Sequence, residues 1–126
     1  MYYDDLLSIE DAVKKVSAMV IQSVSMSDNE LTFIFQGGAT LKMRDNGQSC
    51  CEIRYMDTDD DLSEFNAGRI HKIELKDGSR KWEDYEAHDI QFLDVTTTQG
   101  FFQIKSHNEH NGWYSGFSIE CKLYLP

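Results

Sequence analysis

The sequence predicts an α+β domain that is mostly antiparallel β-sheet, either one curled sheet or a small sandwich, over residues 1–126. Short segments of alternating apolar and polar residues recur along the chain, and turns rich in glycine and asparagine separate them. A helical spacing of apolar residues is clear only near the N-terminus. The chain has 126 residues, of which 40% are hydrophobic, which is enough to bury a core without disulfides. The only proline is Pro126, and no Pro-rich, Ser-rich or repeated segment indicates a linker, so we expect a single domain.

The first elements are a helix and a β-hairpin. Ser8 is a suitable N-cap, and apolar residues follow it at helical spacing, so we expect one N-terminal helix that ends before Ser23. Residues 31–35 alternate in polarity and predict a strand. The Gln-Gly-Gly sequence at 36–38 favours a turn with positive φ, after which residues 39–43 return as the partner strand.

The later elements are short strands with one helical turn between them. Aspartates before Leu62 favour the N-terminus of a short helical turn near residues 59–66, which Gly68 would end. The strands and turns expected after it are strand 70–75, a turn at Asp77-Gly78, strand 88–98, a turn at Gln99-Gly100, and strands 101–106 and 113–125.

Chemically versatile residues concentrate in two stretches, Ser49-Cys50-Cys51-Glu52-Ile53-Arg54 and His107-Asn108-Glu109-His110-Asn111-Gly112-Trp113-Tyr114. On a strand, the first stretch places alternate residues on opposite faces. We expect Cys51 to be a small buried hydrophobic residue and Cys50 to lie near the surface. If the two stretches are adjacent in the fold, they form one polar site that carries thiols and imidazoles.

Zinc is the metal that these residue types suggest, with Cys50, His107 and His110 as the candidate ligands and Cys51 as a fourth. Adjacent residues on a strand point to opposite faces, and zinc-binding cysteines are usually two or more residues apart. The spacing therefore argues against zinc, and we expect no cofactor. The asparagines and glycine around residues 107–112 favour a polar hairpin loop over a metal site.

The chain is strongly acidic, with 22 acidic and 12 basic residues and a formal net charge of −10. This charge repels phosphate, so we expect no direct binding of nucleic acid. Scattered over the surface, the carboxylates would serve only solubility. Gathered on one face, they would imitate a phosphate backbone and attract basic partners. The expected partner-binding residues are two acidic blocks with two aromatic anchors. They are Asp57, Asp59, Asp60, Asp61 and Glu64 in the first block, and Trp82, Glu83, Asp84, Tyr85 and Glu86 in the second, which continues to Asp89 and Asp94.

The composition also bears on the compartment. No apolar run approaches the roughly 20 residues that a membrane-spanning helix needs, and the first residues are acidic instead of a hydrophobic leader. The three cysteines are an odd number, which is typical of a protein with reduced thiols. We therefore expect a cytoplasmic protein without a membrane partner.

Several short motifs occur in an order that resembles a known family. They are Leu6-Leu7, Cys50-Cys51-Glu52, Asp61-Leu62, Gly68 closely followed by Ile70, and Asn111-Gly112-Trp113-Tyr114-Ser115. Together they resemble a family of small, uncharacterised domains encoded mainly by bacteriophages and their hosts. The chain differs in having Trp113 where the family more often has tyrosine, and in adding His107 and His110. The resemblance implies a phage or mobile-element accessory protein that acts on host machinery, and it implies no mechanism.

The leading functional hypothesis is a phage-encoded, non-enzymatic inhibitor or adaptor that works in the host cytoplasm. It would bind the basic face of a host nucleic-acid-binding protein or nuclease, CRISPR effectors included. One alternative is a metal-binding or thiol-dependent small enzyme centred on Cys50, Glu52, His107, Glu109 and His110. A second alternative is an oligomeric structural or assembly component, held together by an unpaired strand edge.

Overall fold

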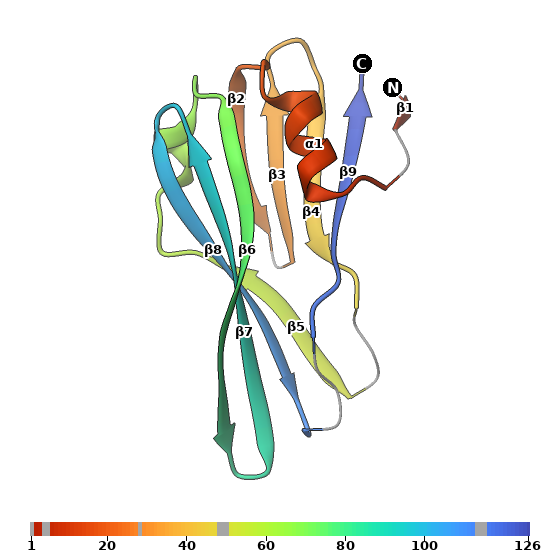
Figure 1. Ribbon diagram of the computed structural model, residues 1–126, viewed down its shortest axis with the longest axis vertical. Helices are drawn as coiled ribbons and strands as arrows, with labels where there is room; N and C mark the ends of the chain where they lie inside the picture. Colours follow the sequence, from red (N-terminus) through yellow and green to blue (C-terminus); the bar gives the residue numbers. More distant parts are fainter. Residues whose placement is uncertain (1, 4–5, 28, 48–50, 113–115) are drawn as a thin grey trace.

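Two antiparallel sheets packed against each other form most of the computed structural model (Figure 1). The structure describes residues 2–3, 6–27, 29–47, 51–112 and 116–126. Sheet A has the strand order β1-β9-β4-β3-β2, and sheet B has the order β5-β8-β7-β6. In chain order the elements are β1 (Tyr2–Tyr3), α1 (Ile9–Val16), β2 (Ile21–Ser27), β3 (Glu30–Phe35), β4 (Thr40–Asp45), β5 (Glu52–Asp57), the 3₁₀ helix η1 (Leu62–Phe65), β6 (Ile70–Glu83), β7 (Glu86–Thr97), β8 (Gly100–His110) and β9 (Ile119–Leu125).

The N-terminal helix begins at the predicted cap. The Ser8 hydroxyl oxygen accepts a hydrogen bond from the backbone N–H of Asp11 at 3.1 Å, and α1 ends at Val16. Ala12 and Val16 are buried, so one face of α1 packs on the core, where it contacts β6 and β9. None of the helices in the described residues has the length and apolar character that a transmembrane span requires.

The hydrophobic core lies between the two sheets. Leu31, Phe33 and Phe35 are fully buried on one face of β3, as the alternation along this strand predicts. Their neighbours from sheet B include Phe102, whose ring centroid lies 6.2 Å from that of Phe33, and η1 adds the buried Phe65. The predicted class is confirmed in its main features, since the fold is largely antiparallel sheet with one α-helix and one helical turn within residues 59–66. The two sheets form a small sandwich that is not closed at its edges.

The predicted turn at Asp77-Gly78 is wrong. Strand β6 continues through these residues to Glu83, and only its register against β7 shifts between Asp77 and Arg80. A Cβ atom at Gly78 would lie 2.5 Å from the carbonyl oxygen of Ile90, so glycine permits close approach of the neighbouring backbone here. The actual turn is Asp84-Tyr85, where both residues have positive φ (44° and 70°), as in the type I′ turns of tight hairpins.

The predicted polar loop around residues 107–110 is also wrong. Strand β8 extends from Gly100 to His110 and lies between β5 and β7, in the interior of sheet B. Cross-strand partners on both sides satisfy its backbone, which outweighs the turn preference of asparagine. The final strand, predicted over residues 113–125, begins at Ile119 in the structure, and residues 113–115 lie outside the described part of the chain.

The left-handed residue after the short helical turn differs from the expected one. Ala67 has a φ of 71°, whereas Gly68 was expected to end η1. Gly68 is instead held against β2, because its carbonyl accepts a hydrogen bond from the N–H of Ile21 at 2.8 Å. An exposed alanine in this conformation carries backbone strain that a glycine would not.

Candidate functional site

The two versatile stretches are adjacent in the fold. Strands β5 and β8 pair in antiparallel register, so Glu52 lies opposite His110 and Tyr55 lies opposite His107. Cys50 lies outside the described residues. Cys51 is exposed, so its predicted burial is wrong. The residues of β5 that face the interior are Glu52, Arg54 and Met56, which are mainly polar.

Side chains of β8 alternate between the two faces of sheet B, which separates the two histidines. Asn108 and His110 point to the inner face toward sheet A, whereas His107 stacks on Tyr55 at the outer face. His107 and His110 therefore do not converge on one ion, and the zinc site that combines them is wrong. The described residues contain no group of three or more histidine, cysteine, aspartate or glutamate side chains placed to hold a metal.

The inner face carries a buried ion pair that joins the two sheets. Arg54 donates to both carboxylate oxygens of Asp45 (3.0 and 2.9 Å) and, through Nη2, to Glu52 at 2.6 Å. The three side chains are only 5%, 1% and 2% exposed. Burial by itself lowers the pKa of Arg54, but hydrogen bonds and charge from Glu52 and Asp45 outweigh burial and raise it. Asn108 extends the set by donating to Glu52 at 2.8 Å. We call Asp45, Glu52, Arg54 and Asn108 the inner ion-pair cluster.

A second polar group continues across the inner face. The carboxylate of Asp89 accepts hydrogen bonds from Arg80 Nη2 and from His110 Nε2, both at 2.8 Å. The Arg80 guanidinium is the main reason that the pKa of Asp89 lies below its usual value. The Nδ1 atom of His110 accepts from the N–H of Gly112 at 2.9 Å, so it carries no proton. Both ring nitrogens of His110 therefore have structural partners.

The outer face carries a chain of three titratable groups. Asp57 Oδ1 lies 3.0 Å from His107 Nε2, and His107 Nδ1 lies 2.8 Å from His88 Nε2. Tyr55 covers His107, with ring centroids 4.5 Å apart and nearly parallel planes. Burial, followed by a hydrogen bond to Glu109, raises the pKa of Tyr55 to about 12. We call Asp57, His88 and His107, with Tyr55 and Glu109, the outer histidine cluster.

The outer histidine cluster resembles a proton relay, but its position does not suit thiol chemistry. A carboxylate that orients one imidazole against another group is a familiar way to set a tautomer. Cys51 precedes Tyr55 by four residues, which is roughly 13 Å along an extended chain. Cys51 and His110 line one pocket of about 290 Å³, but the nitrogens of His110 already bind Asp89 and Gly112, so neither of the two polar groups offers Cys51 an available imidazole base. The geometry thus favours structural roles for both histidine groups.

The family of the chain follows from a match that covers most of its length. Residues 10–119 match the family model described as "Domain of unknown function (DUF7448)". The chain belongs to this family. No curated protein and no solved structure matches it. Membership in the DUF7448 family thus bears out the expectation of an uncharacterised domain family, and it brings no activity with it.

Residues 82–86 of the second acidic block of this DUF7448 domain form an exposed tip, whereas Asp89 and Asp94 of the same block are buried and paired with Arg80 and Lys76. The tip lies at the β6–β7 turn, which projects past the end of sheet A at the bottom of Figure 1. Tyr85 is 95% exposed and Trp82 is 60% exposed. Glu83, Asp84 and Glu86 beside them are exposed carboxylates. We call these five residues the hairpin tip.

The first acidic block lies at the end of β5, in the loop after it and in η1, and it is partly used within the fold. Asp57 binds His107, Asp60 accepts a hydrogen bond from the N–H of Gln103 at 2.9 Å, and Asp61 caps η1 through Ser63. Asp57 of β5 and Phe92 of β7 both lie opposite Lys105 of β8, so they are level with each other across sheet B. Phe92 is six residues from Glu86 along β7. The two blocks are therefore separated by about 20 Å along the strands. This distance is well beyond the screening length of about 8 Å, so they act as separate surfaces.

Proposed function

We propose that this protein is a non-enzymatic binding protein whose hairpin tip contacts a basic face of a nucleic-acid-binding protein or nuclease. The observation that carries the proposal is the state of Tyr85. Its side chain is 95% exposed and its backbone has a φ of 70°. A large aromatic residue gains almost nothing from packing there, and left-handed backbone is unfavourable for it. Strain of this kind concentrates at functional sites.

The chemistry of the hairpin tip fits a basic protein surface. Tyrosine and tryptophan are the residues that most often dominate the energy of protein interfaces. Trp82 is held in place, because the Arg80 guanidinium lies 5.5 Å from its ring centroid and its ring edge is packed against Gly112. Trp82, with these contacts, supplies an anchor, and the three carboxylates in and beside the two-residue turn supply long-range attraction.

The first acidic block supports the proposal as a second, weaker contact. Asp59 is 94% exposed and pairs with Lys105 only at 3.4 Å, and Glu64 is also exposed. Exposed pairs of this kind contribute little to folding, so these carboxylates are available to steer a basic partner. The block lies too far from the hairpin tip to bind the same small patch.

The proposed setting is a phage or mobile-element protein in the cytoplasm of a host cell, and host nucleases such as CRISPR effectors are the proposed class of partner. The order of motifs that resembles a phage-encoded family supports this setting. The net charge of −10 supports the class of partner, because nuclease surfaces that hold nucleic acid are basic.

Affinity capture from a host lysate at ~50 mM and ~500 mM salt tests the proposal. The wild-type protein should retain a basic nucleic-acid-binding protein at the lower salt and release it at the higher one. The double variant Trp82→Ala/Tyr85→Ala and the charge-neutral triple variant Glu83→Gln/Asp84→Asn/Glu86→Gln should both lose it. The matched variant Asp59→Asn/Glu64→Gln, which also removes exposed carboxylates, should weaken capture far less.

Two outcomes would contradict this function. One is capture that is unchanged by both hairpin-tip variants, which would place the contact elsewhere on the molecule. The other is capture that does not depend on salt, which would remove the role of the carboxylates.

A further inference from the structure

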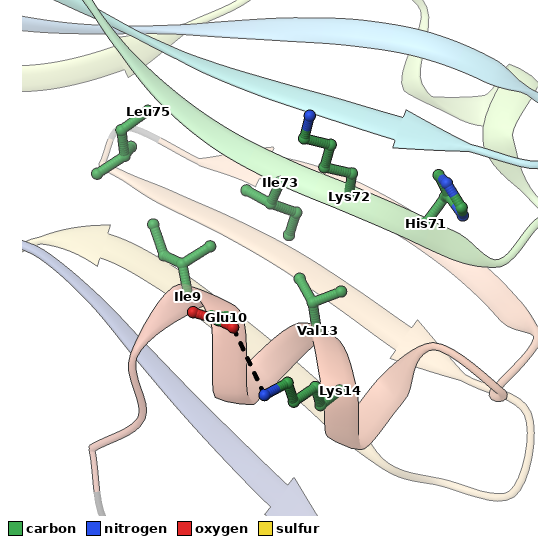
Figure 2. Close-up of a pocket in the computed structure, with 8 residues that line it drawn as sticks. All are labelled: Ile9, Glu10, Val13, Lys14, His71, Lys72, Ile73 and Leu75. Carbon is green, nitrogen blue, oxygen red and sulfur yellow. Dashed lines mark ion pairs between the residues drawn. The ribbon is translucent and has the colours of Figure 1, made fainter.

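A groove between α1 and β6 is distinct from every site described above. It has a volume of about 530 Å³. Figure 2 shows that Ile9 and Val13 of α1 point toward Ile73 and Leu75 of β6 across it. Ile9 and Val13 are half-buried and Leu75 is 42% exposed, so the groove has an apolar lining that the fold leaves partly open.

The strand that forms one wall of the groove has an open edge. Strand β6 is the last strand of sheet B, and no strand in the described part of the chain pairs with its far side. In an antiparallel strand, every second residue directs its N–H and C=O away from the paired neighbour. Long open edges are usually blocked because they recruit other strands. Two lysines on β6 have carboxylate partners at 3.0 Å, which are Glu74 for Lys72 and Asp94 for Lys76. Helix α1 also contacts this strand, so the groove is the part of the edge that remains accessible.

We propose that the groove binds an extended segment of a partner protein, which adds to sheet B as one strand beside β6. Alternate apolar side chains of the segment would enter the space between α1 and β6, and intervening acidic side chains would meet the lysines at its rim. An edge strand with an apolar slot beside it is a recurrent way to bind extended peptides. Residues 71–75 of β6 span about 16 Å and the eight residues of α1 about 12 Å, so four or five residues of the segment fit.

The charged residues that line the groove favour an acidic segment. Its polar lining consists of Lys14, Lys72 and His71 against a single carboxylate, Glu10, in a protein of net charge −10. Lys14 and Glu10 form an ion pair at 3.5 Å, with side chains 70% and 81% exposed. The Lys72–Glu74 pair is also exposed, with side chains 58% and 42% exposed. Such exposed pairs are weak, so both lysines re-pair with incoming carboxylates at little cost.

A single extended segment fits the groove between α1 and β6 better than a second copy of the protein. A copy that paired through its own β6 would bring its own α1, which contacts that strand, against the first α1. It would also bring a second net charge of −10. The groove is independent of the hairpin tip as well, since Leu75 and Trp82 are seven residues apart on β6, which is about 23 Å.

Selection from a displayed library of random eight-residue peptides tests the proposal. The wild-type protein is the target, and the Leu75→Glu variant serves for counter-selection. The expected result is an enriched pattern of alternating apolar residues with acidic residues between them. The matched variant Ile34→Glu, which changes an exposed apolar residue on a strand of sheet A, should bind the consensus peptide within two-fold of wild type. Leu75→Glu and Lys72→Glu should lower the affinity for the consensus peptide at least ten-fold.

Two measurements with the synthetic consensus peptide define the mode of binding. Its addition should shift the backbone amide signals of residues 71–76 and of α1, and leave those of the hairpin tip unchanged. Methylation of alternate peptide nitrogens on the edge that faces β6 should abolish binding, whereas methylation on the other edge should not.

Several results would overturn the inference. These are the absence of any enriched pattern, a consensus peptide that Leu75→Glu binds as well as wild type, and equal binding of both methylated peptides. A dimer in light scattering that Leu75→Glu converts to a monomer would assign the groove to a second copy. Because Trp82→Ala/Tyr85→Ala leaves the groove intact, failure of the hairpin tip and failure of the groove are distinguishable.

Discussion

Replacing Tyr85 with glycine gives a sharp test of the role assigned to the hairpin tip. The side chain is 95% exposed, so it buries only about 10 Å² of the ~200 Å² of a tyrosine, which is worth about 0.3 kcal/mol. Its φ of 70° is unfavourable by about 1–2 kcal/mol for a residue with a Cβ atom, and this backbone strain is absent in glycine. Glycine in turn loses about 0.5–1 kcal/mol more conformational entropy on folding. The net expectation is that Tyr85→Gly stabilises the fold by about 0.5 kcal/mol.

Urea unfolding followed by circular dichroism measures this effect, with thermal unfolding as a check. A gain of about 0.5 kcal/mol corresponds to a rise of about 2 °C in Tm for a chain of this length. Ala67→Gly is the matched control, because Ala67 is also exposed with a φ of 71° but lies near η1, far from the hairpin tip. Both variants should be neutral to slightly more stable than wild type.

Binding separates the two variants. Tyr85→Gly should lower the affinity for the captured partner at least ten-fold, or by about 1.4 kcal/mol, whereas Ala67→Gly should leave the affinity unchanged. A loss of more than about 1 kcal/mol of folding stability in Tyr85→Gly would refute the reasoning. It would mean that Tyr85 is a packing residue, and that its strain has no need of a functional explanation.

Four further predictions concern the polar groups and thiols. Arg54→Met should lower the free energy of unfolding by about 3–5 kcal/mol in urea titrations at pH 7, because it leaves two buried carboxylates without their cation. The low pKa of Asp89 adds stability that is present above its unfolded value of about 4 and is lost as pH falls further, so Asp89→Asn should flatten this part of the acid unfolding curve. The pKa of Tyr55, raised to about 12, gives stability that is lost as pH rises from 10 through 12, and Tyr55→Phe should remove this alkaline slope. Burial raises the pKa of Cys121 to about 11, so iodoacetamide at pH 8 should label the exposed Cys51 and leave Cys121 unlabelled until the protein is unfolded, as peptide mass spectrometry would show.

Periodicity predicted the elements that bury apolar residues, and it failed where local turn chemistry competed with the sheet. The helix after Ser8 and the strand at residues 31–35 follow directly from their patterns. Asp77-Gly78 has the composition of a turn, yet its glycine serves a close approach between two strands. The stretch His107–His110 also has the composition of a loop, but pairing on both sides keeps it in β8, which local propensity does not report.

The candidate sites were predictable only in part. The exposed aromatics of the hairpin tip were expected from their polar surroundings, although the tight turn at Asp84-Tyr85 was not, since neither residue is a glycine. The sequence suggested that the two versatile stretches could be adjacent, but whether they pair depends on the order of the strands in the sheet, which the sequence does not show. The groove beside β6 was not expected, because its walls come from α1 and β6, which are far apart in sequence. A local signal for it was the apolar residue Leu75, which is followed by six polar or glycine residues on the same strand.

The inner ion-pair cluster has a consequence for the alignment of the two layers. Apolar contacts tolerate sliding, because one aliphatic side chain replaces another at small cost. Arg54 of sheet B, by contrast, can bind Asp45 of sheet A at only one relative position of the two sheets. If one sheet were displaced along the other, both charges would remain buried without a partner. We expect this ion pair to fix the position of sheet A relative to sheet B. The projecting hairpin can then change in length or sequence without disturbing how the sandwich is assembled.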